Sequence, residues 1–194
     1  MTDFPVTPAA TAALSVATRF YSPALLNHCV RSYLWGRAYA AAHGVAFDDE
    51  LFYVSAMLHD IALTEPFDSH RVAFEQAGGD LAWVFGVAAG WPEARAARAE
   101  EIIVLHMRDD VPAAVDAESH LLQVATSWDV AGLRPEEFPD ALRVQIVEEY
   151  PRQGFAEEFV ACLRDQAERK PDGAAAGSMA RGGADRMRAN PLDA

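Results

Sequence analysis

Signals that start and stop helices recur along this chain, whereas signals for β-strands are scarce. Thr7-Pro8 and Ser22-Pro23 each combine a helix-capping hydroxyl with a proline suited to the first helical turn. Gly44 follows a long segment with helical character and is expected to end it, and Asp48 can cap the next helix. No sustained period-two alternation of β-branched residues occurs. The pattern therefore predicts an all-α fold.

The same signals divide the chain into approximate segments. We expect helices over residues 8–20, 23–43, 49–63, 70–90, 92–107, 117–130, 135–150 and 153–170, with Ser69 as the cap of the fourth and Gly78-Gly79 as a break or bend within it. Residues 1–20 form an N-terminal helix, 21–170 a helical bundle, and 171–194 a tail that is flexible or packed on a neighbouring surface. The prediction is a single domain built as a bundle of seven or eight helices.

The overall charge limits the class of partner. With 51% hydrophobic and 23% charged residues the chain is globular, and its net charge of −13 argues against nucleic acid or an anionic membrane as a partner. No apolar run approaches the ~20 residues of a membrane span, and the acidic N-terminal segment does not resemble a signal peptide. We expect a cytoplasmic protein that acts on a small molecule, and a homo-oligomer is compatible with the sequence.

Four of the expected helices carry a histidine or an aspartate where an apolar residue would be usual. His28 lies within "LLNHCVRSYL", His59 and Asp60 within "VSAMLHDIALT", His106 within "EEIIVLHM" and Asp129 within "LLQVATSWDVAG". A carboxylate in apolar surroundings needs a counter-charge, strong hydrogen bonds or a metal. Taken singly, each histidine is more commonly a satisfied core residue. Taken together, imidazoles and carboxylates suit one divalent ion, with zinc as first choice and iron, manganese or nickel as alternatives.

In this order the segments resemble the motifs of the HD-domain superfamily of metal-dependent hydrolases, and most closely its cyanamide hydratase-like branch. The resemblance runs from about Tyr21 to Pro171. Besides the histidines and aspartates, the matching positions include Asn27, Arg31, Tyr33, Thr64, Phe74-Glu75, Gly78, Ala125-Thr126, Tyr150-Pro151-Arg152 and Lys170-Pro171. The sequence departs from the pattern at Cys29, where serine is common, and at Ala62, where glycine is usual.

The resemblance implies a role for each of these side chains. The implied metal ligands are His28, His59, Asp60 and Asp129. The implied reaction is attack by metal-bound water on a small, neutral substrate such as cyanamide or a nitrile. With cyanamide the product would be urea. His106 and Glu75 are the predicted catalytic residues, and an additional metal ligand is the alternative for His106. The predicted substrate-binding residues are Asn27, Arg31, Thr64 and His106.

Two other functions remain open. An HD-type phosphohydrolase acting on a nucleotide or phosphate monoester would need several basic side chains at the pocket. The motifs bring only Arg31, with Arg71 or Arg152 as possible additions, which favours a neutral substrate. The second alternative is a non-catalytic, metal-containing binding domain, which a closed site with four protein ligands would favour.

Overall fold

The computed structural model describes residues 4–108 and 110–193, and within these ranges it confirms the all-α prediction, with ten α-helices and no strand. The helices are α1 (Pro8–Phe20), α2 (Pro23–His43), α3 (Asp49–Leu58), α4 (Phe74–Ala88), α5 (Glu93–Leu105), α6 (Ala117–Ala131), α7 (Asp140–Glu149), α8 (Phe155–Arg169), α9 (Ala174–Ala180) and α10 (Gly183–Arg188). Short 3-10 helices cover Ile61–Leu63, Pro135–Glu137 and Pro191–Asp193. In the described part of the chain, no helix combines the length and hydrophobicity that crossing a lipid bilayer requires.

The predicted caps at the first three helices are confirmed. The side chains of Thr7, Ser22 and Asp48 each accept a backbone N–H of the first turn that follows, which satisfies a donor without an intrahelical partner. Gly44 ends α2 in the left-handed conformation, at φ 65°, where a residue with a Cβ would be strained.

Three predicted helices have other bounds in the structure. The seventh, expected over 135–150, is a short 3-10 helix at Pro135–Glu137 followed by α7, which begins at Asp140. The third helix stops at Leu58, so His59 and Asp60 stand in the turn that follows rather than within a helix. The hydroxyl of Ser69 accepts the amides of Arg71 and Val72 in a local turn, and α4 starts only at Phe74. The expected break at Gly78-Gly79 does not occur, since α4 runs without interruption from Phe74 to Ala88. Both glycines are buried within it.

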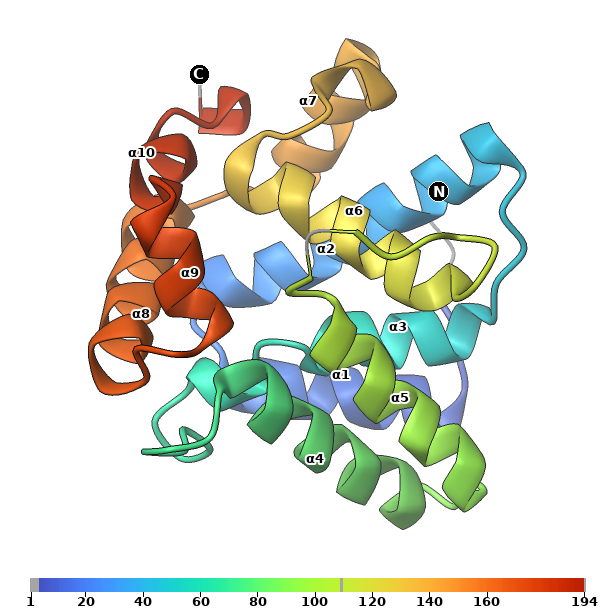
Figure 1. The fold of residues 1–194 in the computed structure, drawn as a ribbon. Coiled ribbons are helices and arrows are strands. Elements are labelled where there is room, and N and C mark those ends of the chain that lie inside the picture. The colour runs from blue at the N-terminus through green and yellow to red at the C-terminus, as the bar shows by residue number, and fades with distance from the viewer. Residues whose placement is uncertain (1–3, 109, 194) are drawn as a thin grey trace.

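Helices α2 and α6 pack against each other through the middle of the molecule (Figure 1). In this view helices α3, α1, α5 and α4 lie below the pair, α8, α9 and α10 lie to its left, and α7 lies above it. Trp35 of α2 and Trp128 of α6 meet edge to face, with ring centroids 6.0 Å apart, and both are fully buried. This contact fixes the register of the central pair, and with it the positions of the polar residues that α2 and α6 carry.

The C-terminal segment is a helical wall rather than a flexible tail. Helices α9 and α10 pack against α8, and α10 also contacts α6. The amide of Asn190 donates to the carbonyl oxygens of Trp128 and Asp129, at 3.3 and 2.9 Å. Arg152 donates from Nε to the carboxylate of Asp193 at 2.6 Å. These buried bonds tie the segment to the end of α6.

Close packing of α2 on α3 depends on Gly36. A Cβ added there would overlap the Phe52 ring, with Cε1 at 2.8 Å, and that ring is fully buried. We expect Gly36→Ala to lower the free energy of unfolding by about 1–3 kcal/mol through overpacking. Urea denaturation followed by circular dichroism measures this. An unchanged midpoint would show that the Phe52 ring moves aside at no cost.

Candidate metal centre

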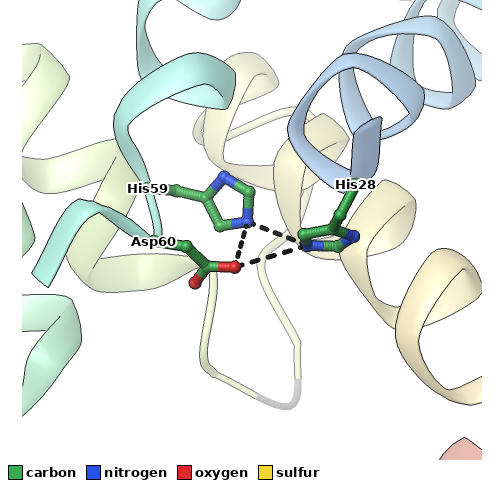
Figure 2. A group of neighbouring side chains, drawn as sticks. All are labelled: His28, His59 and Asp60. Atoms are coloured by element: carbon green, nitrogen blue, oxygen red, sulfur yellow. Dashed lines mark hydrogen bonds and ion pairs between the residues drawn. The ribbon is translucent and has the colours of Figure 1, made fainter. Parts of the chain in front are cut away.

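Three side chains from two segments converge on one point (Figure 2). Nε2 of His28 lies 3.2 Å from Nε2 of His59 and 3.5 Å from Oδ2 of Asp60, and the last two atoms are 3.2 Å apart. All three side chains are completely buried. One atom from each residue can therefore bind a single ion, and these are three of the four predicted ligands.

The turn after α3 explains how adjacent residues reach the same point. Because α3 ends at Leu58, Asp60 leaves helical geometry, at φ −105° and ψ 11°, and the ~100° divergence of neighbours on a helix no longer applies. Behind the turn, Gly78 lets the backbone of α4 approach closely. A Cβ at this glycine would lie 3.2 Å from the carbonyl oxygen of His59.

Asp60 supplies the test of whether a metal fits. Neither of its carboxylate oxygens has a hydrogen-bond partner among the described residues, although both are buried. Burial raises the pKa of Asp60, but attraction to the neighbouring imidazoles, His59 first, together outweighs burial and lowers the pKa, so the group is a buried anion. Burial lowers the pKa of His59, but Asp60 and then Cys29 together outweigh burial and raise the pKa well above its usual value. Such an anion is expected to coordinate a cation, so the residues present fit a divalent metal.

Hydrogen bonds on the opposite ring nitrogens orient the imidazoles. Nδ1 of His59 donates to the carbonyl of Ala56 at 2.8 Å, and Nδ1 of His28 donates to Oδ2 of Asp129 at 2.7 Å. With Nδ1 engaged in this way, Nε2 is the nitrogen of each ring that faces the common point, and it would bind a metal in its unprotonated form. Anchoring of this kind is typical of histidines that bind metals.

Asp129 lies on the far side of the His28 ring, and its oxygens are not in the three-atom group. Its carboxylate accepts Nε and Nη2 of Arg31, both at 2.8 Å, and the indole N–H of Trp35, also at 2.8 Å. Burial raises the pKa of Asp129, but the Arg31 guanidinium and the His28 ring together outweigh burial and hold the pKa well below its usual range. A buried cation and two further donors thus hold this carboxylate against the back of His28, and the predicted ligand role of Asp129 stays a prediction.

His106 lies beside the group, at the end of α5. Its ring centroid is 5.0 Å from that of His59, and its Nδ1 donates to the carbonyl of Ile103. Burial and then the neighbouring His59 lower the pKa of His106 to about 4, so the ring is neutral near pH 7. The imidazole is available as an acceptor through Nε2.

A pocket of about 200 Å³ opens beside these residues. His28, His59, Asp60 and His106 line its inner part, and apolar side chains such as Val130, Leu133, Phe159 and Met187 line the remainder. The amide side chain of Gln123 faces it from α6 and has a buried oxygen with no hydrogen-bond partner among the described residues. The site therefore combines potential metal donors with room for a small molecule.

The other predicted substrate and catalytic residues lie outside the lining of this pocket. Asn27 donates to the carbonyl of Pro151 at 2.8 Å, and Thr64 donates to the carbonyl of Ile61 at 2.7 Å, where it ends a 3-10 helix. The Arg31 side chain is fully buried against Asp129. Glu75 faces a separate small cleft with Lys170 and Gly173, where burial raises its pKa. Asn27, Thr64 and Arg31 are thus engaged by backbone carbonyls or by a buried partner, which the motif pattern could not reveal.

Three arginines that sequence reasoning missed line the pocket instead. Arg108 follows α5, Arg181 lies between α9 and α10, and Arg186 lies in α10. The missed residues come largely from the segment expected to be a tail. Gln123 lies within the quoted motif "LLQVATSWDVAG". It stands four residues before Ser127, so both polar side chains lie on one face of α6, and both line the pocket. This spacing is the sequence signal that could have identified Gln123.

Together, the fold and these donors define an all-α protein with a candidate metal centre inside a substrate-sized pocket. No family model matches the chain. It is similar to two cyanamide hydratases of Saccharomyces cerevisiae, DDI2 and DDI3. Each is 29% identical to it over 154 residues, which cover 77% of this chain and 68% of the relative. This similarity supports the predicted resemblance to the cyanamide hydratase-like branch.

Proposed function

We propose that this protein is a metal-dependent hydratase of the HD type that adds water to a carbon–nitrogen triple bond of a small molecule. The observation that carries the proposal is the buried Asp60 carboxylate at the base of a pocket, which has no hydrogen-bond partner among the described residues and lies 3.2 Å from Nε2 of His59 and 3.5 Å from Nε2 of His28. The similarity to two yeast cyanamide hydratases supports the choice of reaction.

His28, His59 and Asp60 would hold the metal, and zinc suits their nitrogen and oxygen donors. When bound, a divalent ion lowers the pKa of water and polarises a nitrile-type group. In the balanced reaction, the water oxygen bonds to the cyano carbon and both water protons end on the cyano nitrogen. The product is an amide or, from cyanamide, urea. We assign Asp129 to orienting His28, since its oxygens accept donors from three side chains.

His106 and Gln123 are the pocket side chains placed to handle protons and polar groups of the substrate. A neutral His106 can accept a proton through Nε2 and return it, because Nδ1 is already used by Ile103. The unpartnered oxygen of Gln123 can accept a hydrogen bond from an N–H of the product. Glu75 takes no part in this proposal, because it faces the separate cleft.

His106→Gln should keep its metal and lose about 10²-fold or more in kcat, because glutamine hydrogen-bonds but does not titrate near neutral pH. Metal content by atomic absorption and kcat across a pH series measure the two effects. If the variant loses metal instead, His106 is a ligand. Unchanged turnover at every pH would show that the proton travels by another route.

The test of the function itself begins with the metal content of the purified protein. Turnover is then assayed on cyanamide, small nitriles and isonitriles, with nucleotides and phosphate monoesters alongside. Hydration that disappears with a chelator and returns with zinc is the expected result. A metal-loaded protein inactive on every cyano compound would contradict the proposal.

Phosphate-ester hydrolysis is the second candidate, and one observation favours it. Three arginines line the pocket, where the motifs alone suggested one, and arginine clusters suit phosphate. Release of phosphate in the same assays decides for this alternative. A binding domain without catalysis is the weaker reading, because the pocket reaches the candidate ligands and has room for a small molecule.

A further inference from the structure

The pocket has an unusual charge for this protein. The chain as a whole carries a net charge of −13. Of the described residues that line the pocket, Asp60 alone is a carboxylate, whereas Arg108, Arg181 and Arg186 are all cations. The pocket is therefore a local basic patch on an acidic protein, and such a patch attracts anions into the cleft.

The charges are separated within the pocket. His28, His59 and Asp60 are completely buried, whereas all three arginines belong to exposed residues. The arginines accordingly mark the solvent end, and the candidate metal ligands mark the inner end. Apolar side chains, including Val130, Leu163 and Met187, complete the lining. A ligand that spans the pocket would meet a metal at one end and guanidinium groups at the other.

Two of the three arginines, Arg181 and Arg186, belong to the C-terminal segment. Nη1 of Arg186 donates to the carbonyl of Arg181 at 2.6 Å, which links the two residues directly. The segment is in turn anchored by Asn190 on the end of α6 and by the pair of Arg152 with Asp193. An anion would therefore meet donors that are already positioned, which reduces the entropy lost on binding.

We propose that the outer end of this pocket is an anion subsite, formed by Arg108, Arg181 and Arg186, and that the substrate is a small cyano compound carrying an oxyanion group, best a carboxylate, at the end away from the metal. This inference rests on the proposed hydratase function and adds the substrate class to it. It replaces the neutral substrate expected from the motifs. That expectation counted Arg31 and Arg152, and both are engaged with Asp129 and the chain around it.

The test compares two small compounds that differ in charge, cyanoacetate and cyanoacetamide. Zinc-loaded wild type should show a kcat/KM at least about tenfold higher for cyanoacetate, the value expected of a charge-assisted hydrogen bond. Arg181→Gln combined with Arg186→Gln should lower kcat/KM for cyanoacetate about tenfold or more and leave cyanoacetamide within about twofold. Binding of each compound to the zinc-loaded protein is measured in parallel by calorimetry.

Arg188→Gln is the control for the Arg186 substitution, because it removes one positive charge from the same helix, α10, at a position outside the pocket. Its guanidinium pairs with Glu157 at 2.7 and 3.0 Å. This variant should behave as wild type with both compounds. Equal loss for cyanoacetate and cyanoacetamide in the double variant would overturn the subsite, as would the absence of any loss.

The binding data separate this proposal from the hydratase function. If no cyano compound is hydrated but cyanoacetate still binds in a manner that depends on Arg181 and Arg186, the anion subsite stands and the hydratase function fails. Hydration that prefers cyanoacetamide, or the absence of cyanoacetate binding, overturns the subsite. Methyl phosphate is the third probe. Arginine-dependent binding of this ester in place of cyanoacetate, with release of phosphate, would identify a phosphate ester as the anion and would overturn the carboxylate.

Discussion

Asp60→Asn is expected to lose its metal and all measurable turnover while staying folded. The substitution keeps the size of the side chain and removes the anion that faces His28 and His59 at 3.5 and 3.2 Å. An amide is a weak ligand for zinc, so we expect metal affinity to fall well beyond the 10–100-fold that loss of an outer hydrogen-bonding partner causes.

The fold should survive because the bundle does not depend on the metal. The core is a continuous apolar cluster that spans α1, α2, α3, α5, α6 and α8, and it includes fully buried Trp35, Trp128 and Phe52. In addition, Asp60 makes no hydrogen bond that the variant would break. In the metal-free protein Asp60 forms ion pairs with His59 and His28, at 3.2 and 3.5 Å, but an imidazole that loses this partner can release its proton, so Asp60→Asn should cost little stability.

Metal content and far-ultraviolet circular dichroism check both parts of this prediction. Glu75→Gln is the matched control, because it also neutralises a largely buried carboxyl but lies outside the pocket, and it should retain both metal and turnover. Loss of helical signal in Asp60→Asn at room temperature would show that the centre is structural. Retention of a full equivalent of metal would remove Asp60 from the ligand set.

The sequence predicted the helices well because their signals are local. Thr7, Ser22, Asp48 and Gly44 act on backbone groups within one turn, so neighbouring residues determine those boundaries. The prediction of a break at Gly78-Gly79 was wrong because the role of these glycines is set by contacts with distant segments. A glycine pair suggests a break, yet these two allow α4 to approach the His59 carbonyl and α5, a contact that depends on distant segments.

The candidate site was predictable in part, for a related reason. His28, His59 and Asp60 stand out because polar groups in apolar segments need a partner, and they do converge. The arginines at the mouth could not be found in this way, because Arg181 and Arg186 lie in a segment with little apolar character. Its position depends on the long-range bonds of Asn190 and Asp193 to the end of α6 and to Arg152. Those bonds join residues far apart in the sequence, so local sequence patterns do not predict them.

Asp129→Asn should give the reverse of the Asp60 result, with a large loss of stability and a moderate loss of metal. Arg31 is fully buried and gives two hydrogen bonds to the Asp129 carboxylate. Its other partners are the backbone carbonyls of Tyr150 and Pro151, which carry no charge. Without the anion, a guanidinium is left uncompensated in the interior. Breaking a buried pair from one side costs about 3–5 kcal/mol, a large part of the usual stability of a domain.

The effect on metal distinguishes the two roles of Asp129. If it orients His28 through Nδ1, as the geometry at 2.7 Å indicates, the asparagine variant should bind zinc about 10–100-fold more weakly. If it is the fourth ligand that the motifs imply, zinc should be lost as completely as in Asp60→Asn. Urea denaturation of the metal-free proteins and zinc titration of the folded ones measure the two quantities separately. Because His59 and His28 can release a proton when Asp60 is replaced, whereas Arg31 cannot when Asp129 is replaced, the stability of the metal-free proteins should fall much more for Asp129→Asn. An equal fall in both variants would contradict the assignment of Asp129 as the buried counter-charge of Arg31.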